Sequence, residues 1–212
     1  MTIWRVKKGL DGKVRARHPW VFSNDLMFSP KGVLPGDPVE LQDEKGNFLA
    51  RGYGNPNSQI AFRALSFEKK IESPQSLEHI QRKIVRAWKA RVDRGFCASY
   101  RIVFSEADEL PGLILDRYLL DNGQCLSVQI NTAGMERIFS STGASGILDI
   151  LRIVVLAVQD EPSWQRSTVI LKNTSSGRKQ EGLTLESAVV LKDPFDLKSN
   201  TKWTVQLENL WI

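Results

Sequence analysis

The chain has 212 residues, of which 42% are hydrophobic and 25% are charged. This ordinary globular balance excludes a disordered chain, and the length allows two small domains, which we expect here. The longest apolar run, residues 153–158, is too short to span a bilayer, and the first residues lack the apolar stretch of a signal peptide. We therefore expect a cytoplasmic protein with no membrane partner.

The two cysteines, Cys97 and Cys125, form no CxxC pair, and the chain has only two histidines. A disulfide framework requires more cysteines, and a zinc site requires more Cys or His ligands at closer spacing. We expect two reduced thiols and no metal.

The excess positive charge lies entirely in the first 70 residues, which contain 12 Lys and Arg against 7 Asp and Glu, whereas the remainder has 17 of each. Before residue 18, a single acidic residue, Asp11, accompanies a cluster of cations. The cluster consists of Arg5, Lys7, Lys8, Lys13, Arg15 and Arg17. Such a concentration indicates a phosphate-binding surface. The alternative is a solvated face that keeps the protein soluble.

Residues 1–70 alternate like short antiparallel strands separated by turns, which predicts a compact β-barrel. The expected strands cover residues 3–8, 38–41, 48–50 and 60–65, with a hairpin turn at 43–46. Residues 52–58 are rich in turn-forming residues, and Gly52 and Gly54 indicate either a bulge or a close approach of another backbone.

A helix is predicted next, with Ser73 as its N-cap and Pro74 at its first position. Its apolar side chains recur at helical spacing, and Gly95 lies where a C-terminal cap belongs. Those side chains are Leu77, Ile80, Ile84, Trp88 and Val92. His79 beside them has no second ligand nearby, so it is expected to be structural or on the surface.

The rest of the chain predicts a mixed α/β domain of the strand-strand-helix-strand-strand type. Strands are expected at residues 101–104, 113–120, 126–130, 168–172, 185–191 and 203–207. A helix is expected within 134–159, interrupted by the small residues at 141–146. The predicted fold class is therefore mixed β and α+β, with the barrel first. Trp4, Trp88, Trp164 and Trp203 are expected in a core or a domain interface.

Residues 15–24 combine cations, an aromatic ring and polar donors, which are the groups that grip phosphates and stack on unpaired RNA bases. Trp20 has an alternative position inside the barrel core. The candidate phosphate contacts are Lys7, Lys8, Lys13, Arg15 and Arg17. The candidate contacts to bases or sugars are His18, Trp20, Ser23, Asn24 and Arg63.

Four segments resemble one protein family. They are residues 15–24, which include His-Pro-Trp-Val-Phe, then 52–63, 100–118 and 129–137, and Glu181-Gly182-Leu183 extends the match. In this order they resemble the N-terminal PUA domain and the central domain of the large-subunit ribosomal RNA cytosine-5 methyltransferases that use S-adenosylmethionine. The resemblance implies a PUA-like RNA-binding barrel at 1–70, a central domain at 74–212, and rRNA of the 23S type as partner.

The catalytic domain of that family is not recognisable in these 212 residues. No strand is followed by a G-x-G-x-x-G loop, and residues 143–146 lack both the spacing and a preceding apolar strand. Neither cysteine has neighbouring cations that would activate a thiolate. We therefore expect RNA binding with no catalysis and no cofactor in this chain, S-adenosylmethionine being used by full-length relatives.

Two alternatives remain open at this point. The chain could be the N-terminal fragment of such a methyltransferase, whose activity needs the missing C-terminal domain. It could also be an interaction module that docks a separate catalytic domain or forms a homodimer.

An acidic segment in the central region has two possible interpretations. Glu106, Asp108 and Asp116, with Arg117 beside them, either face a catalytic domain across a domain interface or cap the turns of a strand-turn-strand unit. In the second case Arg117 would pair with one of the three carboxylates.

Overall fold

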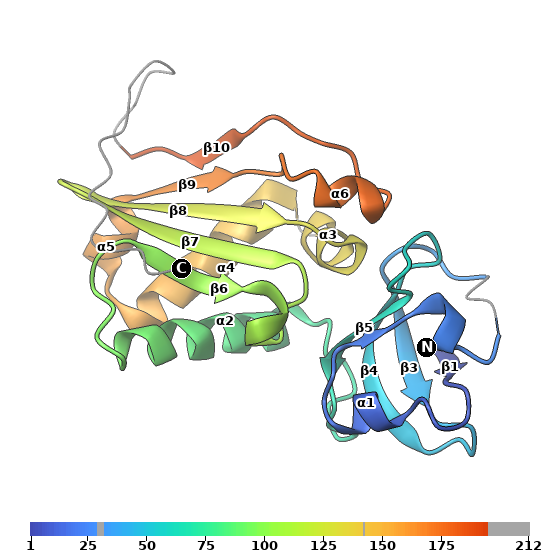
Figure 1. Cartoon of the computed structure of the whole chain (residues 1–212). Helices are drawn as coiled ribbons and strands as arrows, with labels where there is room; N and C mark the ends of the chain where they lie inside the picture. Colours follow the sequence, from blue (N-terminus) through green and yellow to red (C-terminus); the bar gives the residue numbers. More distant parts are fainter. Residues whose placement is uncertain (29–31, 142, 195–212) are drawn as a thin grey trace.

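The computed structural model describes residues 1–28, 32–141 and 143–194. They form two five-stranded sheets, with helices gathered on the second sheet (Figure 1). The predicted mixed β and α+β fold class is confirmed. The strand predicted at 203–207, together with Trp203, lies outside the described residues.

The N-terminal sheet has the strand order β1-β3-β4-β5-β2. Its strands are β1 (Thr2–Arg5), β2 (Trp20–Val21), β3 (Asp37–Gln42), β4 (Phe48–Gly54) and β5 (Phe62–Ser66), with the short helices α1 (Gly12–Arg15) and η1 (Ser23–Asp25). Backbone hydrogen bonds from Lys7 to Asp25 and from Met27 to Arg5 join the segment after β2 to the end of β1. The sheet therefore curls toward closure, and its two edge strands approach each other.

Strand β4 continues to Gly54, beyond the predicted end at residue 50. A Cβ atom at Gly52 would lie 1.9 Å from the Arg63 carbonyl oxygen, and the β4–β5 register shifts between Arg51 and Gly52. Gly52 thus lies at a bulge and also at a close approach of another backbone, and both predictions for this glycine are confirmed.

The C-terminal sheet has the order β10-β9-β8-β7-β6, in which β8 and β9 are parallel. Its strands are β6 (Tyr100–Phe104), β7 (Leu113–Leu120), β8 (Gly123–Ile130), β9 (Ser167–Leu171) and β10 (Val189–Lys192). The helices of this part are α2 (Leu77–Val92), η2 (Ser105–Asp108), α3 (Ala133–Ser140), α4 (Gly143–Val158), α5 (Glu161–Gln165) and α6 (Gly177–Gln180). The predicted interruption near residues 141–146 separates α3 from α4.

Helix α2 begins three residues later than predicted. Its N-cap is Ser76, whose hydroxyl oxygen accepts from the His79 backbone N–H, so the cap assigned to Ser73 and Pro74 was wrong. The sequence motif misled because serine stands at both positions, and only the second is followed by helical backbone. At the other end, Gly95 has a φ of +84°, as a C-terminal cap requires.

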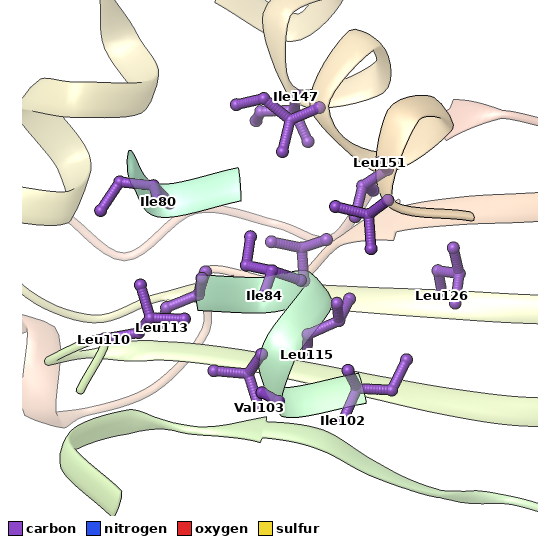
Figure 2. Close-up of a cluster of buried hydrophobic side chains, with 14 of the residues drawn as sticks. Ile80, Ile84, Ile102, Val103, Leu110, Leu113, Leu115, Leu126, Ile147 and Leu151 are labelled. Carbon is purple, nitrogen blue, oxygen red and sulfur yellow. The ribbon is translucent and has the colours of Figure 1, made fainter. Parts of the chain in front are cut away.

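The larger hydrophobic core lies between the C-terminal sheet and the helices α2 and α4. Figure 2 shows Ile84 of α2 and Leu151 of α4 directed toward Leu115 on β7, and all three are buried. Two residues of the N-terminal sheet, Tyr53 and Leu65, also belong to this core. Trp88 and Trp164 lie in it as well, while Trp4 lies in the smaller core of the N-terminal sheet.

No single helix among the described residues is long and apolar enough to cross a membrane, although the bent pair α3–α4 would pass by length and composition alone.

Candidate functional site

The N-terminal sheet meets the C-terminal part through a buried tyrosine. The Tyr53 hydroxyl lies 2.8 Å from Thr132 Oγ1 and 3.1 Å from the Pro111 carbonyl oxygen, and burial raises the pKa of this phenol. Gly134, at the start of α3, lies so close that its Cβ would come within 2.2 Å of the Tyr53 ring. The two parts are therefore held in one fixed arrangement at this contact.

Beside it, Arg63 lies between two carboxylates of the C-terminal part. Its guanidinium donates to Glu106 Oε1 and to Glu181 Oε1, each at 2.8 Å. Trp20 completes this group, because its ring faces the guanidinium at 5.6 Å and its Nε1 donates to Glu106 Oε1 at 2.9 Å. We call these four residues the Arg63 cluster. Trp20 thus lies at the contact between the two parts, neither free nor inside the barrel core.

Glu181 is the most connected residue of the cluster, and the sequence did not single it out as a site residue. Its carboxylate is buried and also accepts from the Asn55 side chain, the Ser58 hydroxyl and the Ala133 backbone N–H. The only signal in the sequence was the Glu181-Gly182-Leu183 match, which carries no information about contacts.

A cleft of about 670 Å³ opens over the Arg63 cluster. Trp20 and Phe22 contribute aromatic surface to its wall, and Phe22 is 40% exposed. Uncharged polar side chains supply most of the remainder. They include Asn57, Gln59, Asn131, Thr132, Ser175 and Gln180. Volume and lining are typical of a site for a small or medium organic group.

A second, smaller cavity of about 300 Å³ lies against the polar face of α2. Four cations line it, together with Glu68, Glu106 and Glu109. The cations are Arg17, Arg82, Lys83 and Arg86. Lys83 is buried and donates to the Leu65 and Glu109 carbonyl oxygens, and burial lowers the pKa of its amine. Because Glu106 lines both cavities, they are neighbours.

The predicted phosphate contacts fall into two kinds. Lys7, Lys8, Lys13 and Arg17 are exposed, and no carboxylate within the described ranges forms a salt bridge with them. Arg15 differs, because its guanidinium contacts Asp11 at 2.6 Å and Asp43 at 2.7 Å. The first four keep their charge available to a polyanion, whereas that of Arg15 is compensated.

Of the predicted contacts to bases or sugars, Trp20 and Arg63 line the larger cleft, whereas His18, Ser23 and Asn24 do not. His18 packs edge-on against Trp20, and its Nδ1 accepts from the Trp20 backbone N–H. Ser23 and Asn24 form η1, and the Asn24 carbonyl oxygen accepts from Lys7 at 2.7 Å. Their contact with RNA stays a prediction.

The acidic segment divides into residues with different contacts. Glu106 contacts the N-terminal sheet through Arg63 and Trp20. Asp108 instead forms a two-point salt bridge with Arg91, and Asp116 forms one with Arg101, both inside the C-terminal part.

The pairing suggested for Arg117 was wrong. Its guanidinium donates to the Gln124 side chain and to the carbonyl oxygens of Cys97 and Ala98. Strand pairing explains the error, because neighbouring residues on a strand point to opposite faces, so Arg117 is directed away from the face that Asp116 shares with Arg101.

The cysteines differ in environment. Cys97 is exposed, whereas Cys125 is buried in β8, where burial raises the pKa of its thiol to about 11. A thiol with a raised pKa is a poor nucleophile at neutral pH.

Comparison with known proteins shows that the N-terminal sheet is similar to a known domain family. Residues 5–67 match the model of a PUA-like domain. Among solved structures, a Streptococcus mutans protein described as a SAM-dependent methyltransferase has a TM-score of 0.61 at 15% identity, covering 82% of this chain and 41% of its own. A second, described as a methyltransferase complexed with SAH, has the same score and identity and covers 82% and 40%. These two similarities concern the fold.

Sequence relatives extend the similarity beyond the first sheet. The chain is 36% identical over 188 residues to ribosomal RNA large subunit methyltransferase I of Photobacterium profundum, covering 86% of this chain and 42% of that protein. It is 30% identical over 191 residues to the Erwinia tasmaniensis protein of the same name, covering 88% and 43%, and 34% identical over 136 residues to that of Salmonella arizonae, covering 62% and 32%. The chain therefore spans 32 to 43% of the length of these relatives, and the predicted resemblance is confirmed at the level of sequence similarity and of the PUA-like domain.

Proposed function

We propose that this chain binds structured RNA, of the 23S rRNA type, through the exposed cations of its N-terminal part. The observation that carries the proposal is the group of four cations without a carboxylate partner, Lys7, Lys8, Lys13 and Arg17, on residues that match a PUA-like domain. Unpaired surface cations are the groups that replace counterions on a phosphate backbone. We also propose that residues 1–70 and 74–212 act as an RNA-binding domain and a central domain.

The names of the relatives support ribosomal RNA as the target, since they are large-subunit rRNA methyltransferases. All four cations lie within residues 5–67. The smaller cavity also contains Arg82 and Arg86 from α2, which the sequence did not single out. Their salt bridges with Glu78 and Glu109 compensate their charge, so we do not include them among the proposed phosphate contacts.

The described residues do not fit S-adenosylmethionine. The parallel crossover from β8 to β9 has its first helix at Ala133, where a cofactor loop would be expected. That helix N-terminus is already contacted by the Glu181 carboxylate, at 3.3 Å from the Ala133 backbone nitrogen. The glycines at 143 and 146 lie inside α4 and follow a helix rather than a strand. We therefore propose that this chain contributes RNA binding and no methyl transfer of its own.

The test is the salt dependence of RNA binding. Fluorescence anisotropy of the full chain with a labelled 23S-type rRNA hairpin, between 50 and 300 mM NaCl, should give a log-log slope of about −3 to −4 if four cations contact phosphates. Changing Lys7, Lys8 and Lys13 together to Ala should reduce the slope by about 2 to 3.

A matched control removes the same charge elsewhere. Lys89, Arg94 and Lys172 are exposed cations of the C-terminal part, and their joint replacement by Ala should leave the slope nearly unchanged. A slope near zero for the unaltered chain, or equal losses in both triple variants, would contradict the proposal. Calorimetry with S-adenosylmethionine should show no heat of binding, and micromolar affinity would contradict the second part.

A further inference from the structure

We propose that the larger cleft holds one unpaired nucleobase of the bound RNA, stacked on Phe22. This inference rests on the proposed RNA binding and adds to it a site and a chemical class of ligand. A base that is splayed out of a helix is recognised by stacking on an aromatic ring and by hydrogen bonds to its edges. The cleft offers both kinds of group, and its volume of about 670 Å³ exceeds the space that one base needs.

Phe22 is the stacking surface because its ring is available. It follows the edge strand β2, is 40% exposed and lines the cleft. The Trp20 ring next to it is already occupied by Arg63 on its face and by Glu106 at its Nε1. Trp20 therefore forms the fixed wall, and Phe22 forms the open side against which a base can lie.

The charge of the cleft selects a base over a phosphate. Its charged residues are those of the Arg63 cluster, in which one guanidinium faces two carboxylates, so the net charge is negative. A phosphate would be repelled there, whereas an uncharged base would not. The amides of Asn57, Gln59 and Asn131 can donate to and accept from a base edge.

One of these amides lacks a partner. Asn131 Oδ1 is buried, and no hydrogen bond to it forms among the described residues. A buried acceptor without a partner is costly. Four such side-chain atoms occur among the described residues, and two of them, Asn131 Oδ1 and Arg63 Nε, belong to residues that line this cleft. Rotation of this side chain about its terminal bond would present an acceptor or donor to a ligand in the cleft.

Backbone strain is concentrated around the same two cavities. Within the described ranges, three non-glycine residues have a positive φ, namely Arg17 at 62°, Ser105 at 50° and Glu109 at 59°. Arg17 and Glu109 line the smaller cavity, and Ser105 lines the larger. Strained backbone of this kind clusters at functional sites. Arg17 in the smaller cavity has no salt bridge among the described residues and can contact the phosphate next to the base.

The experiment compares three RNA hairpins that differ at one position: an unpaired nucleotide bulge, the same bulge without its base, and a fully paired stem. Binding of the full chain is measured by anisotropy at fixed salt. The bulged hairpin should bind about ten-fold tighter than the abasic one, since stacking of a base on an aromatic ring adds to the affinity. Phe22→Ala should abolish this preference and leave the salt slope unchanged.

Phe28→Ala is the matched control, because Phe28 is 76% exposed in the same part of the chain but does not line the cleft. It should keep the preference for the base. Asn131→Ala should reduce that preference. Thermal unfolding of this variant, measured in parallel, checks that it is folded.

The outcomes separate the two proposals. If RNA binds with a steep salt slope but without preference for the base, the cleft inference is overturned and the proposed function stands. If the preference survives Phe22→Ala, the base binds elsewhere and the inference is again overturned. If no hairpin binds even at 50 mM salt, the proposed function itself fails.

Discussion

Two groups of cations in the N-terminal part have opposite environments. Arg63 is buried between Glu106 and Glu181, both from the C-terminal part. Lys7, Lys8 and Lys13 are exposed and have no carboxylate within salt-bridge distance in the described ranges. From the sequence alone, each of these residues is simply one positive charge. The structure teaches that the first joins two parts of the molecule, whereas the others remain available to a partner.

The largest expected effect comes from removing the buried cation. Arg63→Met should lower the free energy of unfolding by about 3 to 5 kcal/mol, because two carboxylates lose their partner inside the protein. Urea denaturation measures this change. The double variant with Glu181→Gln should recover part of the loss.

Arg15→Met serves as the control for that comparison, since Arg15 also faces two carboxylates but is half exposed. Its denaturation midpoint should stay close to that of the unaltered chain. Equal losses for Arg15→Met and Arg63→Met would show that burial does not distinguish the two.

The contact between the parts can also be broken without touching a charge. Gly134→Ala should destabilise the protein by about 1 to 3 kcal/mol, because the added Cβ would lie 2.2 Å from the buried Tyr53 ring. Thermal unfolding measures the loss. Gly12→Ala, where nothing lies within 4 Å of an added Cβ, should be neutral or slightly stabilising.

A smaller effect, on RNA affinity, should distinguish two nearby cations of α1. Lys13 has no salt bridge among the described residues, and Arg15 has two. Lys13→Ala should weaken RNA binding a few-fold and reduce the salt slope by about 1, whereas Arg15→Ala should do less. Anisotropy titrations of both variants at two salt concentrations measure the difference, and a larger loss for Arg15→Ala would refute the distinction.

The smallest effect concerns pH. Burial, followed by the charges of Lys83 and Arg82, lowers the pKa of His79 below its ordinary value of 6.5, so the folded state favours the neutral ring. The unfolded chain then binds the proton first, and the stability from this residue is present above pH 6.5 and is lost as the pH falls toward the lowered value. Melting temperatures between pH 7.5 and 5.5 should decline less in His79→Gln, and an identical decline would remove His79 as a cause.

Much of the fold could be predicted because its signals are local. Strand β7 has the predicted bounds, and Gly95 caps α2 as expected. Alternation, helical spacing and turn residues report on neighbours in the chain, so they need no knowledge of distant contacts. The start of α2 was missed because two serines offered the same local cap, and the helical backbone begins only after Ser76.

The candidate site was predicted only in part, because its contacts join residues that are far apart in the chain. The sequence determined that a strongly basic segment with Trp20 and Phe22 exists, since composition and order are its own properties. It could not show that Arg63 meets Glu181, which is 118 positions away, or that the cleft forms around them. Tertiary structure decided which charges are buried against partners and which stay exposed, because ion pairs and cavities depend on distance in space rather than on separation along the chain.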